Sequence, residues 1–117
     1  MTTAQITLAV VLSLAFLPLG LAKIAAVAFM RKAAAHLGMS AGLYRVIGTL
    51  EVAGAVGLLL GPVSVWVGVA AAIGLALLMT AAAVVHLRHG DPPVRSLPAA
   101  VLALAAVAYA GVAVAAG

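Results

Sequence analysis

Glu51 and Lys23 are two charged residues that lie deep within long apolar stretches of the sequence. A charge inside a bilayer is costly and usually serves a function. If residues 6–30 and 43–60 are helical, the rise per residue places Lys23 about 10 Å and Glu51 about 12 Å from the same membrane surface. These similar depths predict an ion pair. The pair either carries a proton or binds a ligand, or it only neutralises two charges and fixes the contact between two helices.

Further polar residues lie toward the same surface. His86 ends the third apolar stretch, and Thr80, about two turns earlier, reaches the depth of Lys23 and Glu51. Arg45 precedes Glu51 by six residues and either extends to lipid headgroups or turns inward toward the carboxylate. The pattern lacks the cluster of carboxylates that would complete a metal site, so we predict none. The predicted site has two groups of residues: catalytic Glu51, Lys23 and His86, and ligand-binding Arg45 and Thr80.

The composition predicts that these residues are held in a membrane. Of 117 residues, 68% are hydrophobic and 7% are charged, too few charges to cover a soluble domain. The absence of cysteine excludes a catalytic thiol, a thiolate metal site and a redox dithiol within this chain. The net charge of +4 is assigned to membrane topology and to anionic lipid headgroups, and no nucleic-acid partner is expected.

Four apolar stretches are long enough to cross a bilayer as helices. We predict one transmembrane domain over residues 1–117, an all-α bundle with helices at about 6–30, 43–60, 63–87 and 97–116. Pro18 falls inside the first helix, where it is expected to produce a kink.

The connections between these stretches differ in character. Gly61 and Pro62 predict a tight turn between the second and third helices. Residues 31–38 are typical of a short interfacial helix that ends at Gly38, and Ser40 is a suitable N-cap for the next helix. The two prolines in residues 91–93 predict a stiff turn rather than a helix.

All six lysine and arginine residues lie in or toward two connections, the one between the first and second helices and the one between the third and fourth helices. The positive-inside rule therefore places those connections in the cytoplasm and both termini on the non-cytoplasmic side. We expect a multi-pass protein of a bacterial inner (plasma) membrane.

Three segments resemble the DoxX-like family of small four-helix membrane proteins. They are GLAK at residues 20–23, RVIGTLEVAGAVGLLL at residues 45–60, and the alanine-rich residues 74–88, which contain His86. The resemblance implies the four-helix fold and matches the polar positions Lys23, Arg45, Glu51 and His86. Some relatives are linked to membrane redox complexes, and the family name comes from a relative of a thiosulfate:quinone oxidoreductase subunit.

Several functions remain open at this stage. The first is a membrane protein that binds a lipophilic ligand such as a quinone in support of redox chemistry, alone, as a homodimer or with a redox partner subunit. The second is a membrane enzyme of the isomerase or hydrolase type that uses Glu51 as acid and base. The third is a structural scaffold subunit. A proton-coupled transporter is disfavoured because the strong charge bias between the two faces does not suit a dual-topology protein.

Overall fold

The computed structural model describes residues 2–116, which form helices and short connections. The helices are α1 (Thr3–Ile24), α2 (Ala28–His36), α3 (Ala41–Leu59), α4 (Val65–Arg88) and α5 (Pro93–Ala116). Four of them, α1, α3, α4 and α5, are long and apolar enough to cross a membrane. The all-α membrane bundle predicted from the composition is therefore confirmed.

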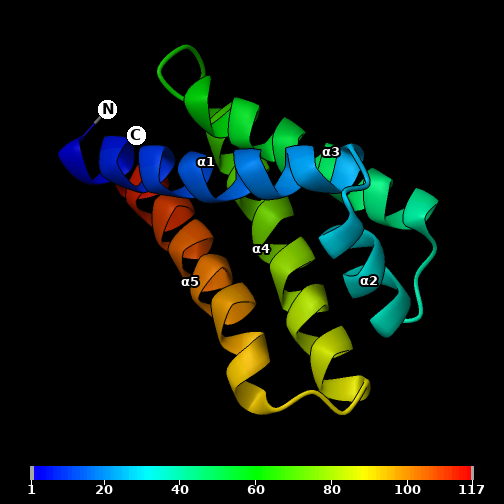
Figure 1. Cartoon of the computed structure of the whole chain (residues 1–117). Helices are drawn as coiled ribbons and strands as arrows, with labels where there is room; N and C mark the ends of the chain where they lie inside the picture. The colour runs from blue at the N-terminus through cyan, green and yellow to red at the C-terminus, as the bar shows by residue number, and fades with distance from the viewer. Residues whose placement is uncertain (1, 117) are drawn as a thin grey trace.

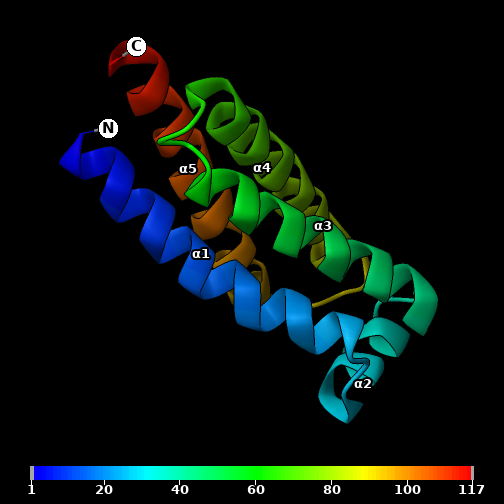
Figure 2. The same cartoon turned by 90° about the horizontal axis from the view of Figure 1, so that it is seen from above.

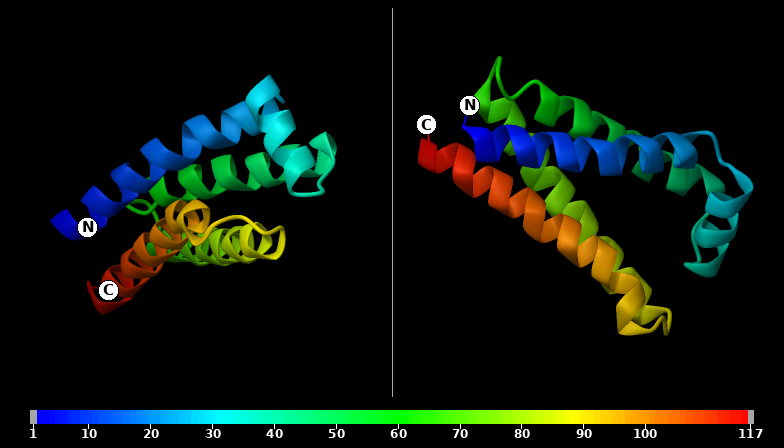
Figure 3. Two further views of the ribbon diagram at one scale, coloured as in Figure 1. Left: turned by 60° about the horizontal axis from the view of Figure 1, so that its bottom comes forward. Right: turned by 60° about the vertical axis from the view of Figure 1, so that its left-hand side comes forward.

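The four long helices form two layers. Helix α1 packs along α3, and α4 packs along α5, while contacts of α3 with α4 and of α1 with α5 join the layers (Figure 2). The layers lie close together where α1 begins and α5 ends, and they diverge toward the short helix α2 (Figures 1 and 3). We call this wider end the α2 end of the bundle, and it contains both α2 and the α4–α5 connection.

Apolar side chains lie both inside and outside the bundle. Leu12, Phe16 and Leu58 are fully buried between the layers, whereas Leu14 and Leu104 are about 70% exposed. Large apolar side chains that face outward along helices of this length require lipid around them.

The end of α1 differs from its predicted position. The helix stops at Ile24 instead of continuing to Met30, and the residues up to His36 belong to the separate helix α2. Val27 donates its N–H to the carbonyl of Ala22, while Ala26 adopts a left-handed conformation with φ of 50°. This is the Schellman arrangement that usually has glycine at the left-handed position. Because an alanine occupies it here, hydropathy alone extends the helix too far.

Other helix boundaries follow recognisable signals. Ser40 accepts a hydrogen bond from the N–H of Leu43 and caps α3, as predicted. The α3–α4 connection covers residues 60–64, so the turn is longer than Gly61 and Pro62 alone. Helix α5 begins at Pro93 rather than at residue 97, because proline is well suited to the first position of a helix.

Glycines let α1 and α3 approach until their backbones touch. A Cβ atom built on Gly48 would lie 2.6 Å from the carbonyl oxygen of Gly20, and one on Gly20 would lie 2.8 Å from the carbonyl oxygen of Gly48. Each glycine precedes a charged residue by three positions, Gly20 before Lys23 and Gly48 before Glu51. Since residues three apart share a helix face, the close contact brings both charged side chains to one interface.

Candidate functional site

The predicted ion pair between Lys23 and Glu51 is present. Lys23 occupies the last turn of α1, where a cation is also favoured by the helix dipole, and its Nζ atom contacts Oε1 of Glu51. The side chain of Glu51 is 1% exposed and that of Lys23 is 11% exposed. Nζ of Lys23 also lies 5.1 Å from the centroid of the Tyr44 ring, within the range of a cation–π interaction.

Glu51 depends on Lys23 for its charge compensation. The second carboxylate oxygen, Oε2, is buried and has no hydrogen-bond partner among residues 2–116. One turn further along α3, the Ser13 hydroxyl donates to the carbonyl of Ala55 at 3.4 Å and so does not reach the carboxylate. An ionised carboxylate at this position is therefore stabilised mainly by a single lysine.

A cavity of about 210 Å³ lies between the two layers at the α2 end. Four polar side chains reach it, one from each long helix: Lys23 from α1, Tyr44 from α3, His86 from α4 and Arg95 from α5. Apolar side chains form the remaining walls: Leu19, Leu37, Met39, Ile47, Leu78, Met79, Ala81, Ala82, Val85, Pro98, Ala99 and Leu102. An apolar space with a few converging polar groups is the usual form of a small-molecule site.

The cavity does not include every charged residue of the predicted site. Glu51 does not line it, because Lys23 lies between the carboxylate and the open space. Among the described residues, a larger groove of about 550 Å³ lies between α3 and α4, but residues such as Leu77 and Gly74 give it only apolar walls. The polar cavity is therefore the better candidate for a site that orients a ligand.

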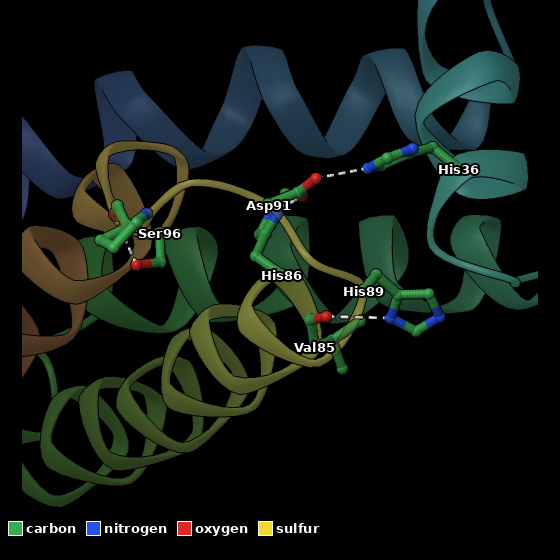
Figure 4. A network of polar contacts seen from close by, with 7 residues as sticks. His36, Val85, His86, His89, Asp91 and Ser96 are labelled. Atoms are coloured by element: carbon green, nitrogen blue, oxygen red, sulfur yellow. Dashed lines mark hydrogen bonds and ion pairs between the residues drawn. The ribbon is translucent and has the colours of Figure 1, made fainter.

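Asp91 joins His86 to a second histidine. Its Oδ2 atom lies 2.7 Å from Nδ1 of His86, and its Oδ1 atom lies 2.5 Å from Nε2 of His36 on α2 (Figure 4). Asp91 is buried, whereas the side chain of His36 is 49% exposed. The carboxylate thus links the α4–α5 connection, which belongs to one layer, to the short helix attached to the other layer.

The backbone explains why Asp91 meets His86. Gly90 has a φ of 76° and ends α4 in a second Schellman motif, in which the Asp91 N–H donates to the carbonyl of His86. The chain therefore turns back on its last helical turn, and the Asp91 side chain falls beside the imidazole. A related motif at Gly38 ends α2, as predicted, and holds His36 at the C-terminus of that helix.

Hydrogen bonds from His86 and then from His36 hold the pKa of the Asp91 carboxyl below its ordinary value. The sequence has only two acidic side chains, and both have partners, Glu51 with Lys23 and Asp91 with the histidines. Arg95, which lines the cavity, therefore has no carboxylate side chain left to pair with it.

Arg45 and Thr80 lie away from this cavity. Arg45 is exposed on α3, and Thr80 is exposed on α4, where its hydroxyl donates to the carbonyl of Ala76 at 2.8 Å. Each lies six residues before a residue of the site, Glu51 or His86, and six residues rotate a side chain by about 120° to another face of the helix. Both residues lie at about the predicted depth along their helices, but their side chains lie on exposed faces and not on the face that lines the cavity.

The sequence pattern did not assign Asp91, Tyr44 or Arg95 to the site, and Arg95 counted only among the basic residues that indicate membrane topology. For Asp91 a usable signal was present, since a glycine directly after a helix predicts that the next residue bonds back to the helix's last turn. For Tyr44 and Arg95 no local signal exists, because their approach to the cavity depends on how the layers diverge.

Comparison with known proteins bears on the family. No curated protein and no solved structure matches the chain. The model of the DoxX-like family matches residues 7–108, a span that includes most of α1, all of α2, α3 and α4, and the part of α5 that lines the cavity. The chain therefore belongs to the DoxX-like family.

Proposed function

We propose that this DoxX-like membrane protein binds a lipophilic molecule such as a quinone in the cavity between its layers, in support of membrane redox chemistry. The observation that carries the proposal is the cavity itself, which combines apolar walls with Lys23, Tyr44, His86 and Arg95. Its volume of about 210 Å³ is below the ~300–1,000 Å³ of pockets that enclose whole drug-sized ligands. It therefore suits the ring of a quinone, with the isoprenoid tail extending into lipid.

The polar residues have complementary roles in this proposal. The Tyr44 hydroxyl, a His86 ring nitrogen and the Arg95 guanidinium can each donate a hydrogen bond to a carbonyl oxygen. The unpaired charge of Arg95 favours negative charge that develops on such an oxygen, and His86 can exchange a proton with it. A bound quinone supplies carbonyl oxygens that accept electrons and protons, and the electrons are expected from a redox partner subunit.

The location of Glu51 favours a supporting role. Because Glu51 lies behind Lys23, it neutralises and orients the lysine that faces the ligand. The same arrangement gives less support to an enzyme in which Glu51 itself acts on a substrate. A scaffold remains the second candidate function, favoured by the tight Gly20–Gly48 contact around the ion pair.

The proposed orientation follows the positive charges. All six lysine and arginine residues belong to the half of the bundle at the α2 end, so we place that end in the cytoplasm and both termini outside a bacterial inner membrane.

Ligand binding is tested with a cavity-filling variant and a matched control. The chain is purified in lipid nanodiscs, co-purified lipophiles are identified by mass spectrometry, and the binding of decylubiquinone is measured at equilibrium. Ala99→Phe places a ring in the cavity, whereas Ala108→Phe adds the same ring to an exposed position of the same helix. We expect the first to weaken binding by about tenfold or more, or about 1.4 kcal/mol, and the second to leave it unchanged. Equal binding by both variants, or none by the wild type, would refute the proposal.

A further inference from the structure

The three side chains that Asp91 brings together connect the cavity to the surface of the α2 end. His86 lines the cavity, and the side chain of His36 is 49% exposed. The Asp91 side chain between them is 5% exposed and has both oxygens in contact with an imidazole. Figure 4 shows the carboxylate between the two rings, which come from separate helices.

Each imidazole offers a different nitrogen to Asp91. His36 uses Nε2, so its Nδ1 remains free, and His86 uses Nδ1, so its Nε2 remains free. The two ring nitrogens of an imidazole lie on opposite sides of the ring, and each can gain or lose a proton. The group therefore has one free nitrogen on the exposed histidine and one on the histidine that lines the cavity.

We propose that His36, Asp91 and His86 form a proton path between the solvent at the α2 end and a ligand in the cavity. A proton enters at Nδ1 of His36, and the proton on Nε2 passes to Oδ1 of Asp91. When His86 is in the tautomer that has its proton on Nε2, rotation of the carboxyl group presents the new proton to the vacant Nδ1 of His86, and the Nε2 proton is released into the cavity. Both imidazoles then return to their starting tautomers before the next transfer. One proton enters, one leaves and no electron moves. The path depends on the proposed function only for the ligand that receives the proton. The contacts that form the path do not depend on which ligand binds.

The same contacts also hold the two layers together, and the two roles are separable by chemistry. Asparagine has the shape of aspartate and offers one acceptor and one donor group, so Asp91→Asn can keep a bridge between the rings. It cannot accept and release a proton as a carboxylate does. A structural bridge predicts a small effect of this change, and a proton path predicts a large one.

His89 provides a matched control at the same end of α4. Its ring is exposed, its Nδ1 atom lies 2.9 Å from the carbonyl oxygen of Val85, and the carboxylate oxygens of Asp91 pair with His36 and His86 instead. A Cβ atom built on Gly38 would lie 3.3 Å from its Nε2 atom, so His89 lies against the end of α2, as Asp91 does. His89→Gln therefore perturbs the same contact between layers without touching the proposed path.

The experiment measures exchange of the His86 ring proton with water, by nitrogen-15 NMR of histidine-labelled protein in nanodiscs without added ligand. We expect Asp91→Asn and His36→Gln each to slow this exchange by about tenfold or more, and His89→Gln to leave it unchanged. Exchange as fast as in the wild type in either path variant would overturn the proposal.

A second measurement separates this proposal from the proposed function. Decylubiquinone binding to His36→Gln should equal that of the wild type, since His36 does not line the cavity and its printed contact is with Asp91 rather than with His86. If the wild type binds no quinone but the exchange rates change as expected, the quinone proposal fails and the proton path stands. If quinone binds and the exchange rates do not change, the path fails and the binding site stands.

Discussion

Gly48→Ala tests the claim that backbone contact between α1 and α3 sets the geometry of the ion pair. The added methyl group would lie 2.6 Å from the carbonyl oxygen of Gly20 and 2.7 Å from Cβ of Lys23. Ordinary contact begins near 3.4 Å, so the two helices must separate by about 0.8 Å. The obstructing atom belongs to the backbone of a helix, and no side-chain rotation can remove it.

The expected cost follows from two opposing effects. Overpacking of a well-packed interface costs about 1–3 kcal/mol. Replacing glycine by alanine inside a helix returns about 1 kcal/mol through helix propensity. Since the clash is with backbone, we expect a cost near the top of the first range and a net loss of about 1–2 kcal/mol. The separation also lengthens the contact between Lys23 and Glu51.

Gly74→Ala is the matched control. Gly74 lies inside α4, and a Cβ atom built there meets nothing within 4 Å, so this change keeps the gain in propensity without the clash. Both variants are compared with the wild type by equilibrium unfolding in mixed detergent micelles containing dodecyl sulfate. The reasoning is refuted if Gly48→Ala proves as stable as Gly74→Ala, because the backbones would then have room to spare.

Three further perturbations address the C-terminal end of α1, the Lys23–Glu51 ion pair, and the contacts of Asp91 with its two histidines. Ala26→Gly should raise the free energy of unfolding by about 1 kcal/mol because glycine adopts the left-handed conformation without strain. Ala25→Gly, at a residue with φ of −70°, should give no such gain. Equal effects of the two changes in thermal unfolding would contradict the prediction. Lys23→Met should lower the free energy of unfolding by about 3–5 kcal/mol because it leaves Glu51 buried without a counter-charge. A double variant with Glu51→Gln should recover part of this loss. If the double variant loses as much stability as the two single variants together, the two residues are not coupled. Because the pKa of Asp91 is lowered in the folded state, its contribution to stability is present above the ordinary aspartate value and is lost as the pH falls through the lowered pKa. The difference in stability between wild type and Asp91→Asn should therefore shrink below about pH 4, and a difference that grows on acidification would count against the bridge.

The four membrane spans were predictable because a helix of about 20 apolar residues is required by the thickness of a bilayer and is visible in composition alone. The contact between Lys23 and Glu51 was predictable for a related reason, since two opposite charges at similar depth in lipid have few other partners. The helix break at Ala26 was not, because alanine gives no sign of a left-handed conformation that packing imposes on it.

The site was only partly predictable because its members depend on direction as well as depth. His86 and Lys23 face the cavity, but Thr80 and Arg45 have rotated to exposed faces of their helices. Asp91 reaches His86 only because the chain reverses at Gly90, a feature that hydropathy does not register. The divergence of the two layers, which creates the cavity, arises from packing along whole helices and has no short motif.

The narrow half of the bundle has a consequence for the membrane in which the protein lies. Between Glu51 and the end that holds both chain termini, no described residue has a side chain that is ordinarily charged, and Leu12, Phe16 and Leu58 are fully buried there. Moving a charge through such a region costs several kcal/mol or more. The half of the bundle that holds the chain termini therefore resists the passage of charge, whereas the α2 end contains the charged side chains. An ion or a proton that enters at the α2 end meets a half of the bundle without charged side chains, which opposes its passage across the membrane.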